Sequence, residues 1–331
     1  MINQIPAFPE GWYFVAIRKN LLRKKLIRKT WMGEEIIVWC NDEGDVCVAD
    51  AFCPHLGAEL GPDSGGMVRN GCLVCPFHGF EFEVGGKCVS TPFAPPPKTA
   101  KLEVYETREI DGMIFAWWGI DGRSPQWSLP EDTELEGNWS DLAFETLQFP
   151  GHPQETTENS VDLAHLRYVH GFENVKRMES LKIDGHYLRS HFEFIRTQNV
   201  GGMKFHFDVC ARAQVYGLGV SYVTTHERSV DMHIRFYMLS TPVDGKHIEV
   251  VLATKIKELR KPKRAIIGMG FLPVSFRTSL MNRLVLSYHK KEVLDDVRIW
   301  RNKRYATQPR LSRSDGEIGR YRRYCRQFYP S

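Results

Sequence analysis

The sequence predicts an α+β protein made of two domains. Its 331 residues exceed the length of a typical single domain. Short apolar runs separated by turn residues fill positions 10–120, which predicts an all-β first domain. Alternating strand-like runs followed by one long helical pattern fill the second half. That order predicts a curved antiparallel sheet with a helix laid on it.

The strands of the first domain are expected to be short and closely spaced. Turn signals such as Gly65-Gly66 and Asp111-Gly112 separate the apolar runs, which read EIIVWC, VCVADAF, CLVCPF and MIFAWW. The proline-rich stretch at 92–98 cannot lie in a central strand, so we expect a surface connection there. The polar segment at 121–138 is rich in turn residues. We therefore place the domains at 1–121 and 122–331.

The second domain carries the longer elements. A short helical segment precedes Gly171, which is expected to stop it. Leu284, Tyr288 and Leu294 are available for the buried face of a late helix over 280–305. The strands expected between these two helices span 187–198, 203–216, 220–229, 231–242 and 247–259.

Composition and charge exclude several classes of protein. Hydrophobic residues make up 42% and charged residues 25%, which is ordinary for a globular chain, and a formal charge of +4 does not indicate nucleic acid as a partner. The N-terminus lacks the pattern of a secretory signal. The apolar stretch that begins at Ala265 is interrupted by Pro273 and Arg277, so it is too short to span a membrane. We therefore expect a cytoplasmic protein whose eight cysteines are reduced or bind metal.

Two basic runs need an explanation, at 18–29 and 257–264. They could contact an acidic reductase, or give peripheral contact with an anionic inner membrane surface. The plainer interpretation is a solvated face.

Two Cys-His pairs in the first domain have the spacing of metal ligands. Cys53 and His55 form one pair, and Cys75 and His78 form the other, each followed by glycine. Two thiolates and two imidazoles could bind zinc. They could instead bind a [2Fe–2S] cluster with two cysteines on one iron and two histidines on the other. Because each pair holds one residue of each type, the spacing favours the cluster. The pattern resembles the Rieske motif.

A second group of candidate ligands lies in the segment ENSVDLAHLRYVH at 158–170. Two histidines and a carboxylate are the usual ligands of a non-haem Fe(II) that keeps open positions. His165 and His170 are five residues apart, so both reach one ion only if the helix ends or distorts between them. Asp162 is placed to hydrogen-bond a ligand imidazole, and Asn159 is a candidate for lining the site. A solvated polar helix is the alternative.

The two groups together resemble the oxygenase (α) subunits of Rieske non-haem iron oxygenases. The second motif of that family, N-x₂-D-x₂-H-x₄-H, reads here Asn159, Asp162, His165 and His170. The resemblance implies a helix-grip catalytic domain of the START/Bet v1 type and a homotrimer. It also implies that Asp162 links His165 to His55 or His78 of a neighbouring chain.

The third iron ligand is expected to be a carboxylate of the late helix. Glu292, Asp295 and Asp296 are the candidates. The family pattern D-x₂-I-W implies Asp296, four residues before Trp300, and Asp295 is the alternative.

The C-terminal sequence SDGEIGRYRRYCRQFYP resembles that of steroid-acting members, the 3-ketosteroid 9α-hydroxylase oxygenase components and the cholesterol 7-desaturases. This resemblance implies an oxidoreductase that uses O₂ to hydroxylate or desaturate a sterol or steroid, with electrons from NAD(P)H through a separate reductase. An aromatic or other small apolar substrate stays open as an alternative. So does an electron-transfer protein without catalytic iron.

Overall fold

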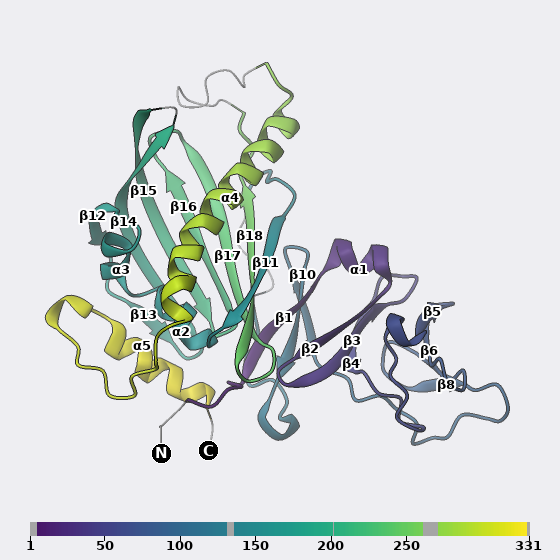
Figure 1. Ribbon diagram of the computed structural model, residues 1–331. Helices are drawn as coiled ribbons and strands as arrows, with labels where there is room; N and C mark the ends of the chain where they lie inside the picture. Colours follow the sequence, from purple (N-terminus) through teal and green to yellow (C-terminus); the bar gives the residue numbers. More distant parts are fainter. Residues whose placement is uncertain (1–4, 131–135, 201, 261–270, 330–331) are drawn as a thin grey trace. The chain divides into compact units, whose positions relative to one another are not determined.

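The computed structural model describes residues 5–130, 136–200, 202–260 and 271–329, and Figure 1 displays the course of the chain. The chain forms two compact units. One unit holds the described residues from Glu10 to 130 together with Pro242–Gly245, and the other holds the rest. The units divide within 131–135, outside the described residues, and the boundary expected at 121/122 stays a prediction.

The N-terminal unit consists of three small antiparallel sheets, in the strand orders β1-β10-β9, β2-β3-β4 and β5-β6-β7-β8. The expected apolar runs form strands here. The strands are β1 (Gly11–Ile17), β2 (Leu26–Trp31), β3 (Glu34–Cys40), β4 (Val46–Asp50), β5 (Met67–Arg69), β6 (Cys72–Val74), β7 (Glu81–Phe82), β8 (Cys88–Ser90), β9 (Thr107–Ile110) and β10 (Met113–Trp118).

The first basic run contains the one α-helix that this unit shows among its described residues, and the expectation of an all-β domain missed it. Helix α1 (Arg18–Lys24) buries Leu21 completely, and its charged residues face away from the core. Lys25 then takes a positive φ of 65° and ends the helix before β2 begins. The basic run therefore forms a helix followed by the start of strand β2. Leu21 provides the helix with a side chain that packs in the core.

The C-terminal unit is built on one eight-stranded sheet. Its order is β11-β18-β17-β16-β15-β14-β12, and β13 pairs with β14. All five strands expected from the sequence are present within a few residues of their predicted ends. The strands are β11 (Ala143–Pro150), β12 (Glu173–Arg177), β13 (Lys182–Asp184), β14 (Tyr187–Val200), β15 (Met203–Tyr216), β16 (Val220–Glu227), β17 (Met232–Pro242) and β18 (His247–Ile256).

Helix α4 (Val274–Trp300) lies across one face of this sheet (Figure 1). Leu286, Val293, Val297 and Trp300 pack on β11 and β18, where the ring of Trp300 stacks on that of Phe149 with centroids 6.0 Å apart. The helix begins six residues before its predicted start and ends five before its predicted end. The fold class predicted from the sequence, an antiparallel sheet with a long helix packed against it, is confirmed.

The buried face predicted for this helix is wrong in two of its three residues. Leu284 is 54% exposed and Leu294 is 45% exposed, and only Tyr288 is partly buried. The face that meets the sheet instead carries His289 and Asp296 among its apolar residues. Because polar residues lie on this inner face, a search for apolar positions in the sequence did not identify which side of the helix meets the sheet.

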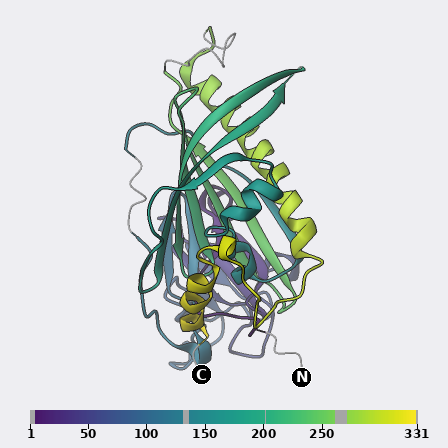
Figure 2. The same ribbon diagram turned by 90° about the vertical axis from the view of Figure 1, so that its left-hand side faces the viewer.

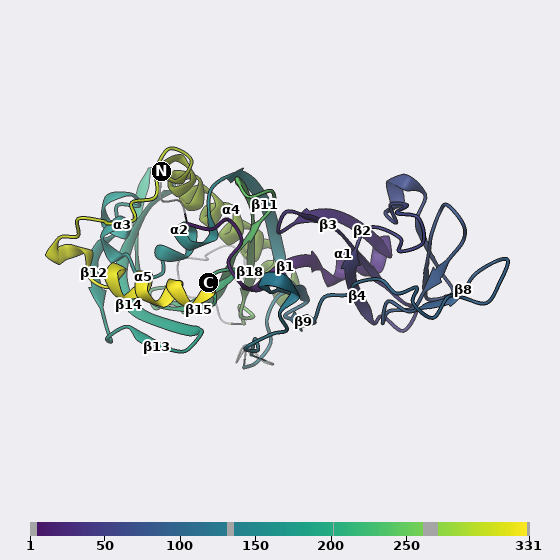
Figure 3. The same ribbon diagram turned by 90° about the horizontal axis from the view of Figure 1, so that it is seen from below.

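Two further features frame the sheet. Figure 2 shows the long hairpin of β14 and β15, which pair without a break from Tyr187–Tyr216 to Val200–Met203. Figure 3 shows α5 (Ile318–Cys325) beside the end of the sheet where β13, β14 and β15 lie. The hydroxyl of Tyr324 donates to the carbonyl oxygens of His186 and Gly217 there.

No helix among the described residues is long and apolar enough to cross a membrane. The first six residues of the apolar stretch that begins at Ala265 and the end of the second basic run fall in 261–270, outside the described residues.

Candidate metal centres and active-site cavity

The two Cys-His pairs of the N-terminal unit lie on loops with the same backbone design. In the first loop the amide of Cys53 donates to the carbonyl oxygen of Ala58, and the amide of Gly57 donates to the carbonyl oxygen of Cys53. In the second loop the amide of Cys75 donates to Phe80, and that of Gly79 donates to Cys75. Both glycines have positive φ, 74° and 66°, a conformation that residues with a Cβ rarely adopt.

The side chains of the two loops meet. Cys53 and Cys75 are buried, and the rings of His55 and His78 have centroids 4.9 Å apart. Burial raises the pKa of the Cys53 thiol to about 11, so a stable thiolate there calls for a nearby positive charge. The Nδ1 atom of His78 is buried and has no hydrogen-bond partner within the described chain. Two thiols and two imidazoles in this state fit an iron–sulfur cluster.

A break between two short helices positions the histidines of the second group. Helix α2 (Pro153–Glu158) and helix α3 (Leu163–Tyr168) are separated by the turn that holds Asn159. His165 lies in α3, and His170 lies after its end, next to Gly171 with φ 69°. The helix therefore ends between the histidines, as their spacing required, and their ring centroids lie 5.2 Å apart.

Asp162 serves as the N-cap of α3. Its Oδ1 accepts hydrogen bonds from the amides of Ala164 and His165 at 3.0 and 3.3 Å. Its carbonyl oxygen accepts a hydrogen bond from Nδ1 of His165. Because that nitrogen carries the proton, Nε2 of His165 keeps a lone pair for a metal. The backbone of Asp162, rather than its carboxylate, thus orients the imidazole within this chain.

Asp296 is the helix α4 carboxylate that approaches the two histidines. One ligand atom each from His165, His170 and Asp296 lies within 4.8 Å of the others. Asp296 is buried and its Oδ2 lies 3.4 Å from Nε2 of His170, whereas Asp295 is exposed. Glu292, the third candidate, instead accepts a hydrogen bond from His289 at 3.2 Å.

The electrostatics of the group suit a divalent cation. Burial is the main reason why the pKa of His165 is lowered, and it keeps this imidazole neutral as a ligand must be. Burial also opposes protonation of His170, but the Asp296 carboxylate outweighs it and raises the pKa of His170. Nδ1 of His170 is buried without a hydrogen-bond partner in the described part of the chain. Two histidines and one aspartate therefore fit a non-haem Fe(II).

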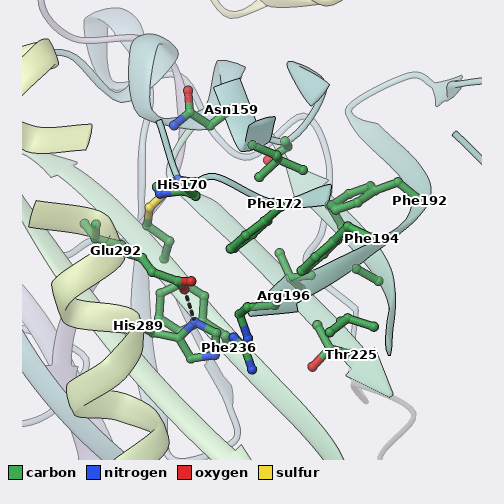
Figure 4. Close-up of a pocket in the computed structure, with 18 of the residues that line it drawn as sticks. Asn159, His170, Phe172, Phe192, Phe194, Arg196, Thr225, Phe236, His289 and Glu292 are labelled. Carbon is green, nitrogen blue, oxygen red and sulfur yellow. Dashed lines mark hydrogen bonds and ion pairs between the residues drawn. The ribbon is translucent and has the colours of Figure 1, made fainter. Parts of the chain in front are cut away.

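An apolar cavity of about 150 Å³ adjoins these residues, which is the volume of roughly five water molecules in the liquid. Figure 4 shows Asn159 and His170 at one end of it and the rings of Phe172, Phe192 and Phe194 along its wall. The wall follows the period of two along each strand. Ala211 and Ala213 are the small side chains that β15 contributes, and they leave space that larger residues would fill.

The structure also brings polar residues to this cavity that the sequence analysis missed. They lie on three separate elements and are Arg196, Thr225, Glu227 and His289. Arg196 follows Phe192 and Phe194 at alternate positions of β14, so its inward direction could have been inferred from the strand pattern. Asn159 lines the cavity, as expected, and Asp162 is not among the residues that line it.

Comparisons with known proteins find a family match for each half of the chain. Residues 11–106 match the Rieske [2Fe-2S] domain, and residues 116–329 match the 3-ketosteroid 9alpha-hydroxylase C-terminal domain. The cholesterol 7-desaturase nvd of Xenopus laevis is 30% identical over 98% of this chain and 72% of that protein. The 3-ketosteroid-9-alpha-monooxygenase oxygenase component of Rhodococcus rhodochrous is 26% identical over 97% of this chain and 84% of its own.

Solved structures share the fold at lower identity. Dicamba monooxygenase bound to 3,6-dichlorosalicylic acid has a TM-score of 0.72 and 17% identity, with 96% of each chain covered. NdmA of Pseudomonas putida CBB5 has a TM-score of 0.66 and 15% identity, covering 95% of this chain and 88% of its own.

These findings define the chain as a Rieske non-haem iron oxygenase, an oxidoreductase with a [2Fe–2S] cluster and a mononuclear iron. Within that class, it belongs to the family of the 3-ketosteroid 9α-hydroxylase oxygenase component and the cholesterol 7-desaturases. The resemblance inferred from the sequence is confirmed. The relative from Rhodococcus rhodochrous is named as an oxygenase component.

Proposed function

We propose that this oxygenase uses O₂ to hydroxylate or desaturate a sterol or steroid. The observation that carries the proposal is the juxtaposition of His165, His170 and Asp296 with an apolar cavity. Curated relatives that align over nearly the whole chain are named for cholesterol and for 3-ketosteroids. A carbon skeleton with few polar groups suits walls made of aromatic rings and aliphatic side chains.

Each ligand set has a separate role in the proposal. Cys53, His55, Cys75 and His78 hold the cluster, and His165, His170 and Asp296 hold Fe(II). When bound, the cluster supplies single electrons and the iron activates O₂. The protein keeps His165 in the tautomer that leaves Nε2 free, and its apolar walls exclude water from the reacting carbon.

Asp162 and the assembly belong to the same proposal. We expect a homotrimer in which the Asp162 carboxylate connects His165 to His55 or His78 of the neighbouring chain. Electrons come from NAD(P)H through a separate reductase. The basic run at 18–29 exposes Lys19, Arg23 and Lys24 on α1. In a cytoplasmic protein it is a candidate contact for an acidic reductase or for the inner membrane surface.

A small aromatic substrate is the second candidate. The cavity of about 150 Å³ is modest in size, and stacked rings such as Phe172 and Phe194, with centroids 4.4 Å apart, suit a planar ligand. A solved structure of similar fold holds 3,6-dichlorosalicylic acid.

Reconstitution with a surrogate reductase separates the two candidates. The iron-loaded protein would receive a panel of sterols, 3-ketosteroids and substituted benzoic acids, and mass spectrometry would detect the products. We expect a product of one added oxygen or two lost hydrogens from the steroid group. Turnover of aromatic acids alone, or of nothing despite full iron loading, would overturn the proposal.

A further inference from the structure

A group of polar side chains is buried inside the otherwise apolar cavity. Arg196 and Thr225 are 6% and 8% exposed, and they face the cavity from β14 and β16. His289 and Glu292 face it from α4, and Glu227 lies beside Arg196. We call these five residues the polar cluster. Figure 4 shows Arg196 and His289 close together at the end of the cavity away from Asn159 and His170.

Hydrogen bonds among the members of the polar cluster satisfy only some of its buried polar atoms. Arg196 pairs with Glu227, and Nδ1 of His289 donates to Glu292. Four buried atoms have no hydrogen-bond partner among the described residues, namely Arg196 Nε, Thr225 Oγ1, His289 Nε2 and Glu292 Oε1. A buried polar group without a partner is unfavourable, because it has lost its hydrogen bonds to water and gained none in return. Such a cost in a ligand cavity is expected where a ligand supplies the missing partners.

The charges of the cluster select a neutral ligand group. Arg196 carries one positive charge, while Glu227 and Glu292 are both acids. Hydrogen bonding to His289 helps to outweigh burial and lowers the pKa of Glu292, so this acid is ionised. The cation of Arg196 is already matched by Glu227. When His289 carries only its Nδ1 proton, a carboxylate or phosphate entering the cluster would meet uncompensated negative charge, and an oxygen without charge would not.

The cluster atoms without hydrogen-bond partners also indicate which neutral group would bind, and they favour a hydroxyl. Arg196 Nε can only donate, and Thr225 Oγ1 can donate or accept. Because the carboxylate of Glu292 can only accept, Nδ1 of His289 carries a proton, and Nε2 accepts when this is the only proton on the ring. A ligand hydroxyl can both accept from Arg196 and donate to His289. A ketone could satisfy the donor alone.

The distance from the iron ligands suits a fused-ring molecule. His289 and Asp296 are seven residues apart on α4, which places them on one face, about 10 Å apart along the axis. That separation is comparable with the length of a few fused carbon rings. Phe172 lies between the two ends of the cavity in Figure 4, and its ring gives the carbon skeleton an apolar wall.

We propose that Arg196, Thr225 and His289 bind a hydroxyl group of the substrate and so determine which carbon lies beside the iron ligands. This inference rests on the proposed function, because it assumes an apolar substrate in this cavity. Arg196, Glu227 and His289 also line a second cavity of about 460 Å³. The hydroxyl would therefore bind where the two cavities meet.

The variant Thr225→Val tests the proposal most cleanly. It keeps the shape of the side chain and removes a hydroxyl that has no hydrogen-bond partner in the described protein, so folding should not suffer. Binding would be measured by equilibrium dialysis on anaerobic, iron-loaded protein. The probes are a 3-hydroxysteroid, its 3-keto form and its 3-deoxy form on one carbon skeleton. We expect the wild type to bind the hydroxy form about 10-fold more tightly than the deoxy form.

In Thr225→Val this 10-fold preference should fall several-fold, while affinity for the deoxy form stays the same. Thr224→Val is the matched control, since Thr224 lies on the same strand and its hydroxyl accepts from Arg235 Nε at 3.1 Å. The double variant Arg196→Met/Glu227→Gln removes the ion pair as a unit and should also reduce the preference. The control should keep it.

The outcomes separate this inference from the proposed function. Equal binding of the hydroxy and deoxy forms by the wild type would overturn the role of the polar cluster, as would an unchanged preference in both variants. Tighter binding of the 3-keto form than of the 3-hydroxy form would overturn the assignment of a hydroxyl group as the ligand. If no steroid binds or turns over, the proposed function itself fails.

Discussion

Asp295 and Asp296 are adjacent on α4, but only Asp296 is buried and near the histidines. Asp296→Asn should lower the iron content by about one atom per chain, because a neutral amide binds Fe(II) more weakly than a carboxylate does. Asp295→Asn, the matched control, should keep full iron content. Metal analysis measures the change, and the EPR signal of the reduced cluster should persist in both variants. Equal iron loss in both variants would show that the burial of Asp296 does not decide the ligand.

Asp162 combines a structural role with the electron-transfer role proposed for it, and two variants can separate these roles. Asp162→Asn keeps an N-cap residue, so its free energy of unfolding should stay close to that of the wild type. Asp162→Ala should lose about 1 kcal/mol, which denaturant titration measures.

In both Asp162 variants the cluster should still be reduced, and product formation should fall at least 10-fold because the proposed link between subunits is lost. Full turnover in Asp162→Asn would refute the bridging role of the carboxylate and leave only the cap.

At the scale of elements, α2 depends on an uncommon cap. Nδ1 of His152 accepts a hydrogen bond from the amide of Gln154 at 3.1 Å, and its Nε2 lies 3.0 Å from the carbonyl oxygen of Pro6. Only the neutral ring can do both, since Nδ1 must lack a proton and Nε2 must carry one. Burial lowers the pKa of His152 from 6.5 to about 4.

The sign of the resulting pH effect follows from where the proton binds. Between pH 6.5 and about 4, the unfolded chain binds a proton at His152 and the folded chain does not. Stability should therefore fall as the pH decreases through this range, by at most about 1.4 kcal/mol per pH unit. His152→Asn keeps a capping side chain without the titration, so its stability should depend less on pH. Parallel slopes for wild type and variant in denaturant titrations from pH 7 to 5 would contradict this account.

Several elements were predictable because their patterns are local. The five long strands of the sheet alternate inward and outward residues, and their ends came within a few residues of the prediction. The register of α4 was not predictable in the same way. Its inner face holds His289, Glu292 and Asp296, which a search for apolar residues rejects. Leu284 and Leu294 were chosen instead and proved exposed.

At the scale of the whole molecule, the proposed trimer makes a strong prediction. Chains with His78→Ala should lack the cluster, and chains with Asp296→Asn should lack the iron, so each alone should be inactive. Co-expressed chains should recover part of the activity, because the cluster of one subunit would serve the iron of its neighbour. Product formation measures the recovery, and mass determination in solution checks the trimer. Inactive mixed trimers would indicate that both centres must work within one chain.

The sequence motifs predicted the sites more completely than the cavity. Ligand motifs keep residues of one centre within short segments, as in 159–170 and at the two Cys-His loops. The polar cluster unites Arg196, Thr225 and His289, which are separated by 29 and 64 positions along the chain. Only the pairing of β14, β15 and β16 and the placement of α4 bring them together. Contacts of this kind depend on tertiary structure and leave no signature in local spacing.

Ala211 and Ala213 line the cavity from β15, and Ala211 lies opposite the ring-bearing Phe192 of β14. Since each ends at a single methyl group, the depth available to a bound molecule depends on two of the smallest side chains in the wall. Exchanging Ala213, which pairs with Val223 rather than with Thr225, for leucine would leave the residues of both iron centres and of the polar cluster unchanged while making the chamber shallower. Relatives of this enzyme could therefore accept thinner or thicker molecules through one substitution, without changing the oxidation chemistry.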